Sequence, residues 1–381
     1  MALSCRALVD SLLRPSSKLT LAMKAPWHLR EFRSLASGKE LDAILISRPS
    51  NIFYATGFKG GSRLLVPADG EPVILVGGVD LVAAQEHFSG TPVKVEHIKL
   101  GEKLDDLMLK LLKETGIKKL GFDELPLKTY SRLVKELGRG NLTDLNGPIW
   151  DLRKSKDKLE RELVRKACQM AVKGMEIASE LMEPSRTELE IVGEIEEALR
   201  KAGSEEHPFN IIVASGPNSA LPHARASGRE LKKGELVIVD LGATCGGYVS
   251  DITRTFVVGK PEGWQEEIYH IVREAQEKAI MALRAGLKAS EVDKVARSVI
   301  EEAGYGPYFI HGLGHGLGIE VHEPPRLAPG FEEALGVNYT VTVEPGIYLP
   351  GKGGVRVEDT VLVLEDGREV LTEFPYGLEL P

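Results

Sequence analysis

Two stretches of the sequence place carboxylates inside otherwise apolar, hairpin-like segments. In residues 236–256, Asp240 lies within an apolar strand candidate, and Asp251 follows a glycine-rich turn. A symmetric hairpin centred between Cys245 and Gly246 pairs Asp240 with Asp251, and directly opposed Cβ atoms lie about 4.5–5.5 Å apart. Facing carboxylates repel each other and are costly to bury without a positive partner. We therefore predict a cation between them; the alternative is a pair of turn aspartates at a sheet edge.

The second stretch, residues 341–364, repeats this arrangement. Glu344 ends a β-branched strand candidate, a Pro-Gly-Lys-Gly-Gly segment forms the turn, and Glu358 lies in the returning strand. The midpoint of the two glutamates is Gly351, inside that turn, so we predict that these carboxylates also face each other. Two such hairpins in one chain are difficult to ascribe to chance.

Between the hairpins lies a glycine-rich segment with three histidines, His311, His315 and His322. Small residues around His315 allow the backbone to approach a shared centre closely. A single histidine is usually an ordinary hydrogen-bonded residue, but three within twelve positions indicate a site. The alternative of a phosphate-binding loop is disfavoured, because the segment has neither a Gly-Lys-Ser/Thr element nor the strand–GxGxxG–helix context.

Four carboxylates and one imidazole form an oxygen-rich ligand set that can hold two divalent cations. Such a set favours Mn²⁺, Fe²⁺, Co²⁺ or Zn²⁺ over copper, and the sequence does not choose among them. Paired cations about 3.5–4 Å apart generate hydroxide at neutral pH and polarise a carbonyl or phosphoryl oxygen. The residues alone therefore predict metal-assisted hydrolysis.

The composition excludes several classes of protein. The chain has 381 residues and a formal net charge of −8, which argues against a nucleic-acid partner. No stretch approaches the roughly 18 consecutive apolar residues that would span a bilayer, so we expect no membrane partner. Three widely spaced cysteines argue against a disulfide framework and a thiolate zinc site. They are typical of a reducing compartment, and we predict a cytoplasmic location.

The pattern of strands and helices divides the chain in two. Strand candidates (43–46, 63–66, 72–75, 118–122) alternate with helical spacing (104–115, 130–137), which indicates an α/β domain. Asn146-Gly147-Pro148 breaks this pattern and predicts a boundary near residues 146–158. Beyond it, two helix pairs (159–181 with 187–202, and 265–285 with 290–303) are each followed by strands, a hint of internal duplication.

The order of the five candidate metal ligands, Asp240, Asp251, His315, Glu344 and Glu358, resembles that of the pita-bread metallopeptidases. The resemblance is strongest to the prolidase (Xaa-Pro dipeptidase) and aminopeptidase P branch. The resemblance spans about residues 155–375, and residues 47–58 resemble part of the accessory domain of the prolyl peptidases and creatinase. It implies a creatinase-like N-terminal α/β domain (25–150) and an α+β pita-bread catalytic domain (151–381). The first residues are rich in Arg, Lys and Ser, and we predict an N-terminal extension (1–24), with a transit-peptide-like segment as the alternative.

The resemblance also implies the roles of the metal ligands. Asp251 and Glu358 would bridge two divalent metal ions in each subunit, Asp240 would complete one site, and His315 and Glu344 would complete the other. Manganese or cobalt is expected, with zinc or iron as alternatives. Glu344 would in addition take a proton from the nucleophilic water.

Further residues surround this ligand set. The resemblance implies that His223 assists substrate binding or proton transfer, that His322 binds substrate and stabilises the tetrahedral intermediate, and that His311 lies near the substrate pocket. Arg326, in a His-Glu-Pro-Pro-Arg sequence, would bind the free carboxylate of a dipeptide, because a guanidinium binds a carboxylate bidentately. Arg356 shares a strand face with Glu358 and is predicted to orient it.

These residues lead to one predicted function and two alternatives. We predict an Xaa-Pro dipeptidase that acts on small peptides with proline at the second position. An aminopeptidase P acting on longer peptides is the first alternative, and a non-catalytic pita-bread binding protein is the second. The resemblance also implies a homodimer.

Overall fold

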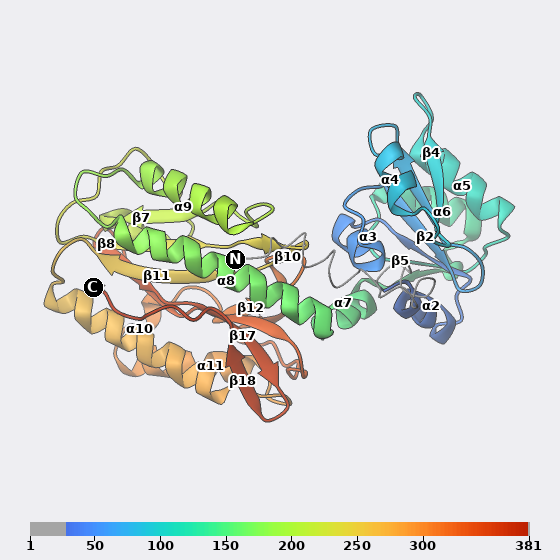
Figure 1. Ribbon diagram of the computed structural model, residues 1–381. Coiled ribbons are helices and arrows are strands. Elements are labelled where there is room, and N and C mark those ends of the chain that lie inside the picture. The colour runs from blue at the N-terminus through green and yellow to red at the C-terminus, as the bar shows by residue number, and fades with distance from the viewer. Residues whose placement is uncertain (1–27, 380–381) are drawn as a thin grey trace, which may run out of the picture. The chain divides into compact units, whose positions relative to one another are not determined.

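The computed structural model describes residues 28–379, so the predicted extension over residues 1–24 lies outside the described residues. The described chain forms two compact units, one ending at Arg153 and the other beginning at Lys154 (Figure 1). The first is built on a single mixed sheet and the second on antiparallel sheets with two helix pairs. The predicted fold class, α/β followed by α+β, is confirmed.

The first unit has a six-stranded sheet in the order β4-β3-β2-β1-β5-β6. Its strands are β1 (Ala43–Ile46), β2 (Arg63–Pro67), β3 (Val73–Gly77), β4 (Lys94–Ile98), β5 (Leu120–Phe122) and β6 (Leu142–Asp144). Its helices are α2 (Leu29–Gly38), α3 (Pro49–Thr56), α4 (Leu81–His87), α5 (Leu104–Glu114), α6 (Leu127–Leu137) and α7 (Asn146–Lys154), with a 3-10 turn η1 (Arg139–Asn141). Pairs β1–β2 and β2–β3 are antiparallel and the others parallel. Apolar residues of the sheet and of α5 form one buried cluster.

The Asn146-Gly147-Pro148 segment is helical and not a break. It opens helix α7, which continues to Lys154. Pro148 falls in the first turn, where the missing N–H has no intrahelical partner to lose, so the helix tolerates it. Only the local break is therefore wrong: the division between the two units, between Arg153 and Lys154, falls within the predicted range 146–158.

The second unit contains two helix pairs, each packed on antiparallel strands. Helices α8 (Lys158–Glu180) and α9 (Glu188–Ala202) contact the sheet β11-β8-β7, whereas α10 (Gly263–Ala282) and α11 (Ala289–Glu302) contact strands of the sheet β13-β12-β14-β17-β18 and of the β15-β16 hairpin. The strands are β7 (Ile212–Ser215), β8 (Leu236–Leu241), β9 (Thr244–Cys245), β10 (Tyr248–Val249), β11 (Ile252–Val257), β12 (Gly314–Gly316), β13 (Glu323–Leu327), β14 (Thr340–Val343), β15 (Gly346–Leu349), β16 (Gly353–Arg356), β17 (Asp359–Leu364) and β18 (Gly367–Val370). The 3-10 turns are η2 (Gly216–Ala220) and η3 (Gly306–Tyr308). The helix pairs flank the strands from opposite sides (Figure 1).

A bridge between Thr253 and Glu358 joins the two hairpins. The Glu358 amide donates to the Thr253 carbonyl at 3.0 Å, and the Thr253 hydroxyl donates to Glu358 Oε2 at 2.7 Å. Two further bonds between Thr255 and Arg356 extend this junction. These bonds fix residues 253–255 of the first hairpin against residues 356–358 of the second.

The register of the first hairpin differs from the prediction. Asp240 pairs with Thr253, and Cys245 pairs with Tyr248, so the turn is centred between Gly246 and Gly247. These two glycines have φ of 56° and 79°, the left-handed conformation that a two-residue hairpin turn requires at both positions. Asp251 is thus two residues from the partner of Asp240. Residues two apart on a strand point to the same face of the sheet, so the Asp240 and Asp251 carboxylates still lie on one face.

The register of the second hairpin agrees with the prediction. Val343 pairs with Asp359, and Gly346 pairs with Arg356, on either side of the two glutamates. Glu344 and Glu358 occupy matching positions between these pairs. The turn falls at Gly351, which has φ of 72°.

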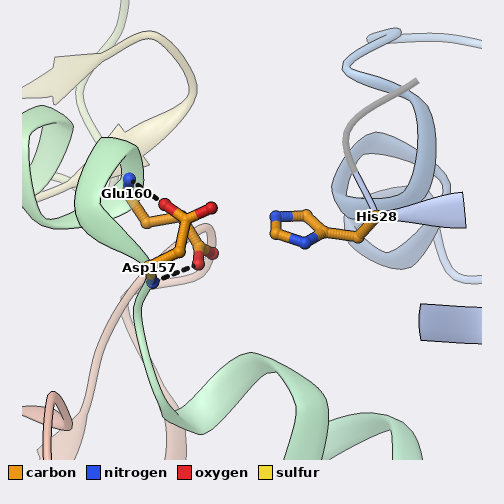
Figure 2. Close-up of side chains that lie close together, drawn as sticks. All are labelled: His28, Asp157 and Glu160. Carbon is orange, nitrogen blue, oxygen red and sulfur yellow. Dashed lines mark hydrogen bonds between the residues drawn. The ribbon is translucent and has the colours of Figure 1, made fainter. Parts of the chain in front are cut away.

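We expect Asp157→Ala to destabilise the second unit through the first turn of α8. Asp157 accepts from the Glu160 amide at 2.8 Å, and Glu160 Oε2 accepts from the Asp157 amide at 2.7 Å (Figure 2). Loss of such a cap costs about 0.5–2 kcal/mol. Asp157→Asn keeps an acceptor and is the matched control. Equal unfolding midpoints for both variants in a denaturant titration would contradict the role of the cap.

Candidate metal centre

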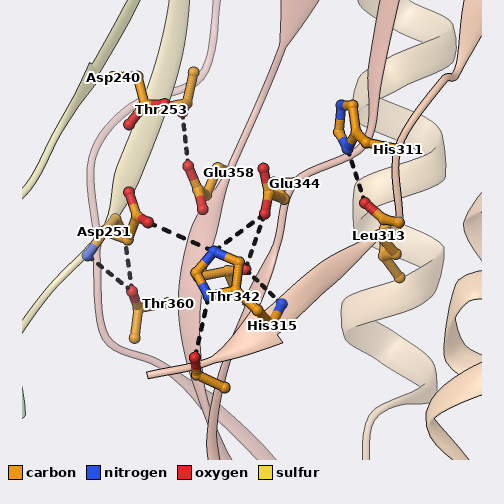
Figure 3. Close-up of polar contacts among 12 residues, drawn as sticks. Asp240, Asp251, Thr253, His311, Leu313, His315, Thr342, Glu344, Glu358 and Thr360 are labelled. Carbon is orange, nitrogen blue, oxygen red and sulfur yellow. Dashed lines mark hydrogen bonds and ion pairs between the residues drawn. The ribbon is translucent and has the colours of Figure 1, made fainter. Parts of the chain in front are cut away.

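Five side chains from both hairpins and from β12 converge at one place (Figure 3). Asp240 lies in β8, Asp251 precedes β11, His315 lies in β12, Glu344 follows β14, and Glu358 precedes β17. His315 Nε2 lies 3.3 Å from Glu344 Oε1 and 3.7 Å from Asp251 Oδ2. Ligand atoms of Asp251, His315 and Glu358 all lie within 4.8 Å of one another. The structure therefore brings together the five residues that the sequence singled out.

Gly314 and Gly316 allow β12 to pack closely between strands β13 and β14. A Cβ on Gly314 would lie 2.1 Å from the Thr342 carbonyl oxygen, and one on Gly316 would lie 2.3 Å from that of Pro324. Any side chain at either position would push the backbone apart. The glycine spacing around His315 thus lets its imidazole reach the carboxylates of the hairpins.

The carboxylates are buried and incompletely bonded. Among the described residues, Asp240 Oδ1, Asp251 Oδ1 and Glu358 Oε1 have no hydrogen-bond partner. Burial and neighbouring carboxylates raise the pKa of Asp251 and of Glu358 well above the usual range. Burial raises the pKa of Glu344 to about 8. Oxygen atoms in this condition are suited to a bound cation, which would replace both their water and their missing partners.

The imidazole of His315 is also suited to a cation. Burial, together with His322, lowers the pKa of His315 to about 3, so the ring is neutral at physiological pH. Its Nδ1 lies 3.1 Å from the Gly316 carbonyl oxygen, which leaves Nε2 toward Asp251 and Glu344. A neutral imidazole whose other nitrogen is fixed by a carbonyl is the usual state of a histidine ligand. The five residues therefore fit one or two divalent metal ions.

Arg356 is oriented differently from the prediction. Its Nη2 lies 2.6 Å from Asp240 Oδ2, and its Nη1 donates to the Tyr348 hydroxyl at 2.9 Å. It reaches Glu358 only through Thr253, to whose hydroxyl its Nε donates at 3.2 Å. The long arginine side chain crosses to the neighbouring β8 strand because Asp240 offers a charged partner there.

Tyr348 and Thr253 are contacts that the sequence reasoning missed. The Tyr348 hydroxyl lies 2.9 Å from His311 Nε2, and burial raises the pKa of this phenol to about 12. Burial lowers the pKa of His311 to about 4, so His311 stays neutral. Side chains alternate along β15, so Tyr348 lies on the same face as Gly346, which pairs with Arg356. This alternation was the one signal in the sequence that Tyr348 lies near Arg356.

A cavity of about 830 Å³ opens over the convergent side chains. It is lined by all ten residues that the sequence predicted: His223, Asp240, Asp251, His311, His315, His322, Arg326, Glu344, Arg356 and Glu358. It is also lined by residues that were not predicted, among them Phe209, Asn210, Ile212, Arg225, Phe331 and Glu333. The rings of His315 and His322 lie edge to face with centroids 4.4 Å apart. Predicted ligands and predicted substrate contacts thus share one cavity.

Buried charges hold the loops around this cavity. Glu323, beside His322, accepts from the Ile319 and Glu320 amides and lies 3.6 Å from the Lys156 ammonium. On α11, Asp293 accepts from the Leu313 amide at 3.0 Å, and Arg297 donates to the His311 carbonyl at 2.8 Å.

Comparisons with known proteins agree with this geometry. Residues 162–365 match the model of metallopeptidase family M24, and residues 28–155 match that of the creatinase/prolidase N-terminal domain. The chain belongs to metallopeptidase family M24. In the part of the chain that the structure describes, no helix is long and apolar enough to cross a membrane.

Individual relatives are similar over nearly the whole chain. A protein named Xaa-Pro dipeptidase from Pyrococcus furiosus is 40% identical over 87% of this chain and 94% of its own. The solved structure of an Xaa-Pro dipeptidase from Bacillus anthracis is 36% identical, covers 92% of this chain and 98% of its own, and has a TM-score of 0.84. An X-Pro aminopeptidase structure from Thermotoga maritima is 32% identical with the same coverage and a TM-score of 0.86.

We expect the metal-free protein to lose stability as the pH rises. The folded pKa values of Asp251, Glu344 and Glu358 lie above their unfolded values of about 4. The protonated carboxyls therefore stabilise the fold below about pH 4, and this contribution is lost as the pH rises toward about 8, the folded pKa of Glu344. The buried, neutral His311 and His315 act in the opposite direction below the unfolded pKa of histidine, about 6.5, so the test is made above it. Thermal unfolding of chelator-treated protein should show a lower midpoint at pH 8 than at pH 7, and added divalent metal should restore it.

The double variant Asp251→Asn, Glu358→Gln is the control for this experiment. It removes two of the titrating carboxyls at nearly constant volume, so its unfolding midpoint should depend less on pH. A metal-free wild-type midpoint that rises from pH 7 to pH 8, or one that changes as much in the double variant as in the wild type, would contradict the assignment.

Proposed function

We propose that this chain hydrolyses the peptide bond before proline in Xaa-Pro dipeptides. The observation that carries the proposal is one cavity that holds three partnerless carboxylate oxygens, a neutral imidazole and the guanidinium of Arg326. The similarity to proteins named Xaa-Pro dipeptidase supports the same substrate.

We assign Asp240, Asp251, His315, Glu344 and Glu358 as the residues that hold two divalent metal ions, with manganese or cobalt as the native metal. Bound there, the metal would supply Lewis-acid polarisation of the scissile carbonyl and acidify a water molecule. The donor set supports this assignment, because hard carboxylate oxygens with one imidazole suit such ions.

The chain's own groups supply proton transfer and orientation. Glu344 is assigned as the group that accepts the proton of the attacking water, because a cation bound beside it would keep this carboxylate ionised at neutral pH. Burial lowers the pKa of His322, and the nearby His223 lowers it further. A neutral imidazole is therefore available to donate a hydrogen bond to the developing oxyanion. His223 and His311 line the same cavity and are assigned to substrate binding and proton transfer.

Arg326 distinguishes a dipeptidase from an aminopeptidase in this proposal. Its side chain is exposed at the cavity, and its guanidinium lies 5.8 Å from the Phe331 ring centroid. No salt bridge to another described residue occupies it, so it is available to a substrate carboxylate. The alternative is an aminopeptidase P that acts on longer peptides, which the similarity to the Thermotoga structure favours. Homodimer formation and a cytoplasmic location stay predictions.

We expect metal-stripped enzyme resupplied with Mn²⁺ or Co²⁺ to cleave an Xaa-Pro dipeptide in preference to the matched Xaa-Pro-Yaa tripeptide. The dipeptide carries its carboxylate on proline, within reach of the proposed clamp, whereas the tripeptide does not. Release of the free N-terminal amino acid measures both reactions. Preferential cleavage of the tripeptide would assign an aminopeptidase, and no cleavage with any metal would favour a non-catalytic role.

We expect Arg326→Ala to raise the KM for Xaa-Pro about 10- to 100-fold with a smaller change in kcat, since a bound carboxylate contributes about 1.5–3 kcal/mol. Arg225→Ala, which removes another exposed guanidinium from the same cavity, is the matched control. A larger KM effect for Arg225→Ala would move the clamp to that residue and disprove the role of Arg326.

A further inference from the structure

Both ends of the segment that carries His223 are bonded to the same buried carboxylate. Residues 216–226, here the His223 loop, connect Ser215 at the end of β7 to Ser227, and four of them line the cavity: Pro222, His223, Ala224 and Arg225. Among the described residues, none hydrogen-bonds to the His223 imidazole. The position of this imidazole therefore depends on how the backbone of its loop is held.

Glu188, the first residue of α9, is completely buried and binds both ends of that loop. Its Oε1 accepts from the Ser215 amide at 2.8 Å, from the Ser215 hydroxyl at 2.7 Å and from Asn218 Nδ2 at 3.2 Å. Its Oε2 accepts from the Ser227 amide at 3.0 Å and from the Ser227 hydroxyl at 2.8 Å. One carboxylate thus closes an eleven-residue loop with five hydrogen bonds.

The first turn of α9 is anchored to the same segment. The Glu188 amide donates to the Arg229 carbonyl at 3.0 Å, and the Leu189 amide donates to that of Ser227 at 3.1 Å. Arg229 in turn donates to the Ser215 hydroxyl at 2.7 Å and forms an ion pair with Glu235. The carboxylate is therefore held in place by its own backbone, and its orientation does not depend on the loop alone.

The middle of the loop contacts the metal-centre side of the unit. The Gly354 amide donates to the Ser219 hydroxyl at 2.9 Å, and Arg356 Nη1 lies 3.4 Å from the Pro222 carbonyl oxygen. Arg356 is the residue that binds Asp240. Glu188 thus bonds the ends of the loop, and β16 bonds its middle. His223 directly follows Pro222, whose carbonyl faces Arg356.

We propose that Glu188 is a positioning residue for His223: it sets the ends of the loop so that the imidazole faces the cavity. The inference rests on the proposed hydrolysis, in which His223 takes part. An ionised carboxylate is suited to this role because it accepts bonds at both oxygens and donates none. Glutamine at this position would place an amide NH₂ against the donors of either Ser215 or Ser227. Two donors cannot bond to each other, so one end of the loop would be released.

The test compares Glu188→Gln with Glu190→Gln. Glu190 lies on the same helix, is exposed and accepts bonds only from Thr187 at the helix N-cap. We expect Glu188→Gln to lower kcat for Xaa-Pro about 10- to 100-fold, the range typical of residues that orient a functional side chain. Bound metal per chain should not change, amide hydrogen exchange in residues 216–226 should accelerate, and Glu190→Gln should behave as wild type.

A double-mutant cycle with His223→Ala separates positioning from general destabilisation. If Glu188 acts through His223, Glu188→Gln should cost little further activity once the imidazole is absent. Additive losses, loss of bound metal, or unchanged exchange in the loop would each overturn the proposal. Should Glu188→Gln not fold, Ser227→Ala removes one hydroxyl donor and should show the same pattern in weaker form. A wild-type enzyme inactive on Xaa-Pro would refute the proposed function, while hydrogen exchange would still test whether Glu188 holds the loop.

Discussion

The mutual repulsion of four carboxylates around one point is the constraint on which this catalytic unit depends. Asp240, Asp251, Glu344 and Glu358 come from two hairpins whose strands pair in fixed register, so they cannot move apart without breaking the sheet. The raised pKa values of Asp251, Glu344 and Glu358 report this repulsion together with burial. Binding cations removes it, which couples the stability of the unit to its activity.

One buried guanidinium offsets part of that charge before any cation binds, and a second fixes the backbone beside it. Arg356 contacts Asp240 directly, whereas Arg254 pairs with Asp359 and donates to the backbone carbonyls of Thr253 and Glu358. Arginine is suited to both positions, because its planar fork reaches several acceptors and keeps its charge when buried. One guanidinium thus orients a carboxylate of the candidate metal centre, and the other fixes the backbone from which a second such carboxylate extends.

The sequence predicted which five side chains would converge, because polar residues in apolar strands and glycines beside a histidine are local signals. It misjudged the first turn by one residue, since only the positive φ of both Gly246 and Gly247 locates the centre. It could not predict the roles of Thr253 or Glu188. Their partners lie far away in the sequence, as with Glu358, 105 residues from Thr253, and no local pattern indicates such contacts.

The three histidines assigned to substrate belong to loops, which a sheet cannot hold in register. Each loop is instead attached to a buried carboxylate that accepts backbone amides: Glu188 for His223, Asp293 for His311, and Glu323 for His322. A charged acceptor bonds a backbone N–H more strongly than a neutral one and leaves the histidine side chain free to face the cavity. Buried acids therefore have two separate tasks in this unit: the partnerless ones attract cations, and the fully bonded ones fix the loops that would contact the peptide.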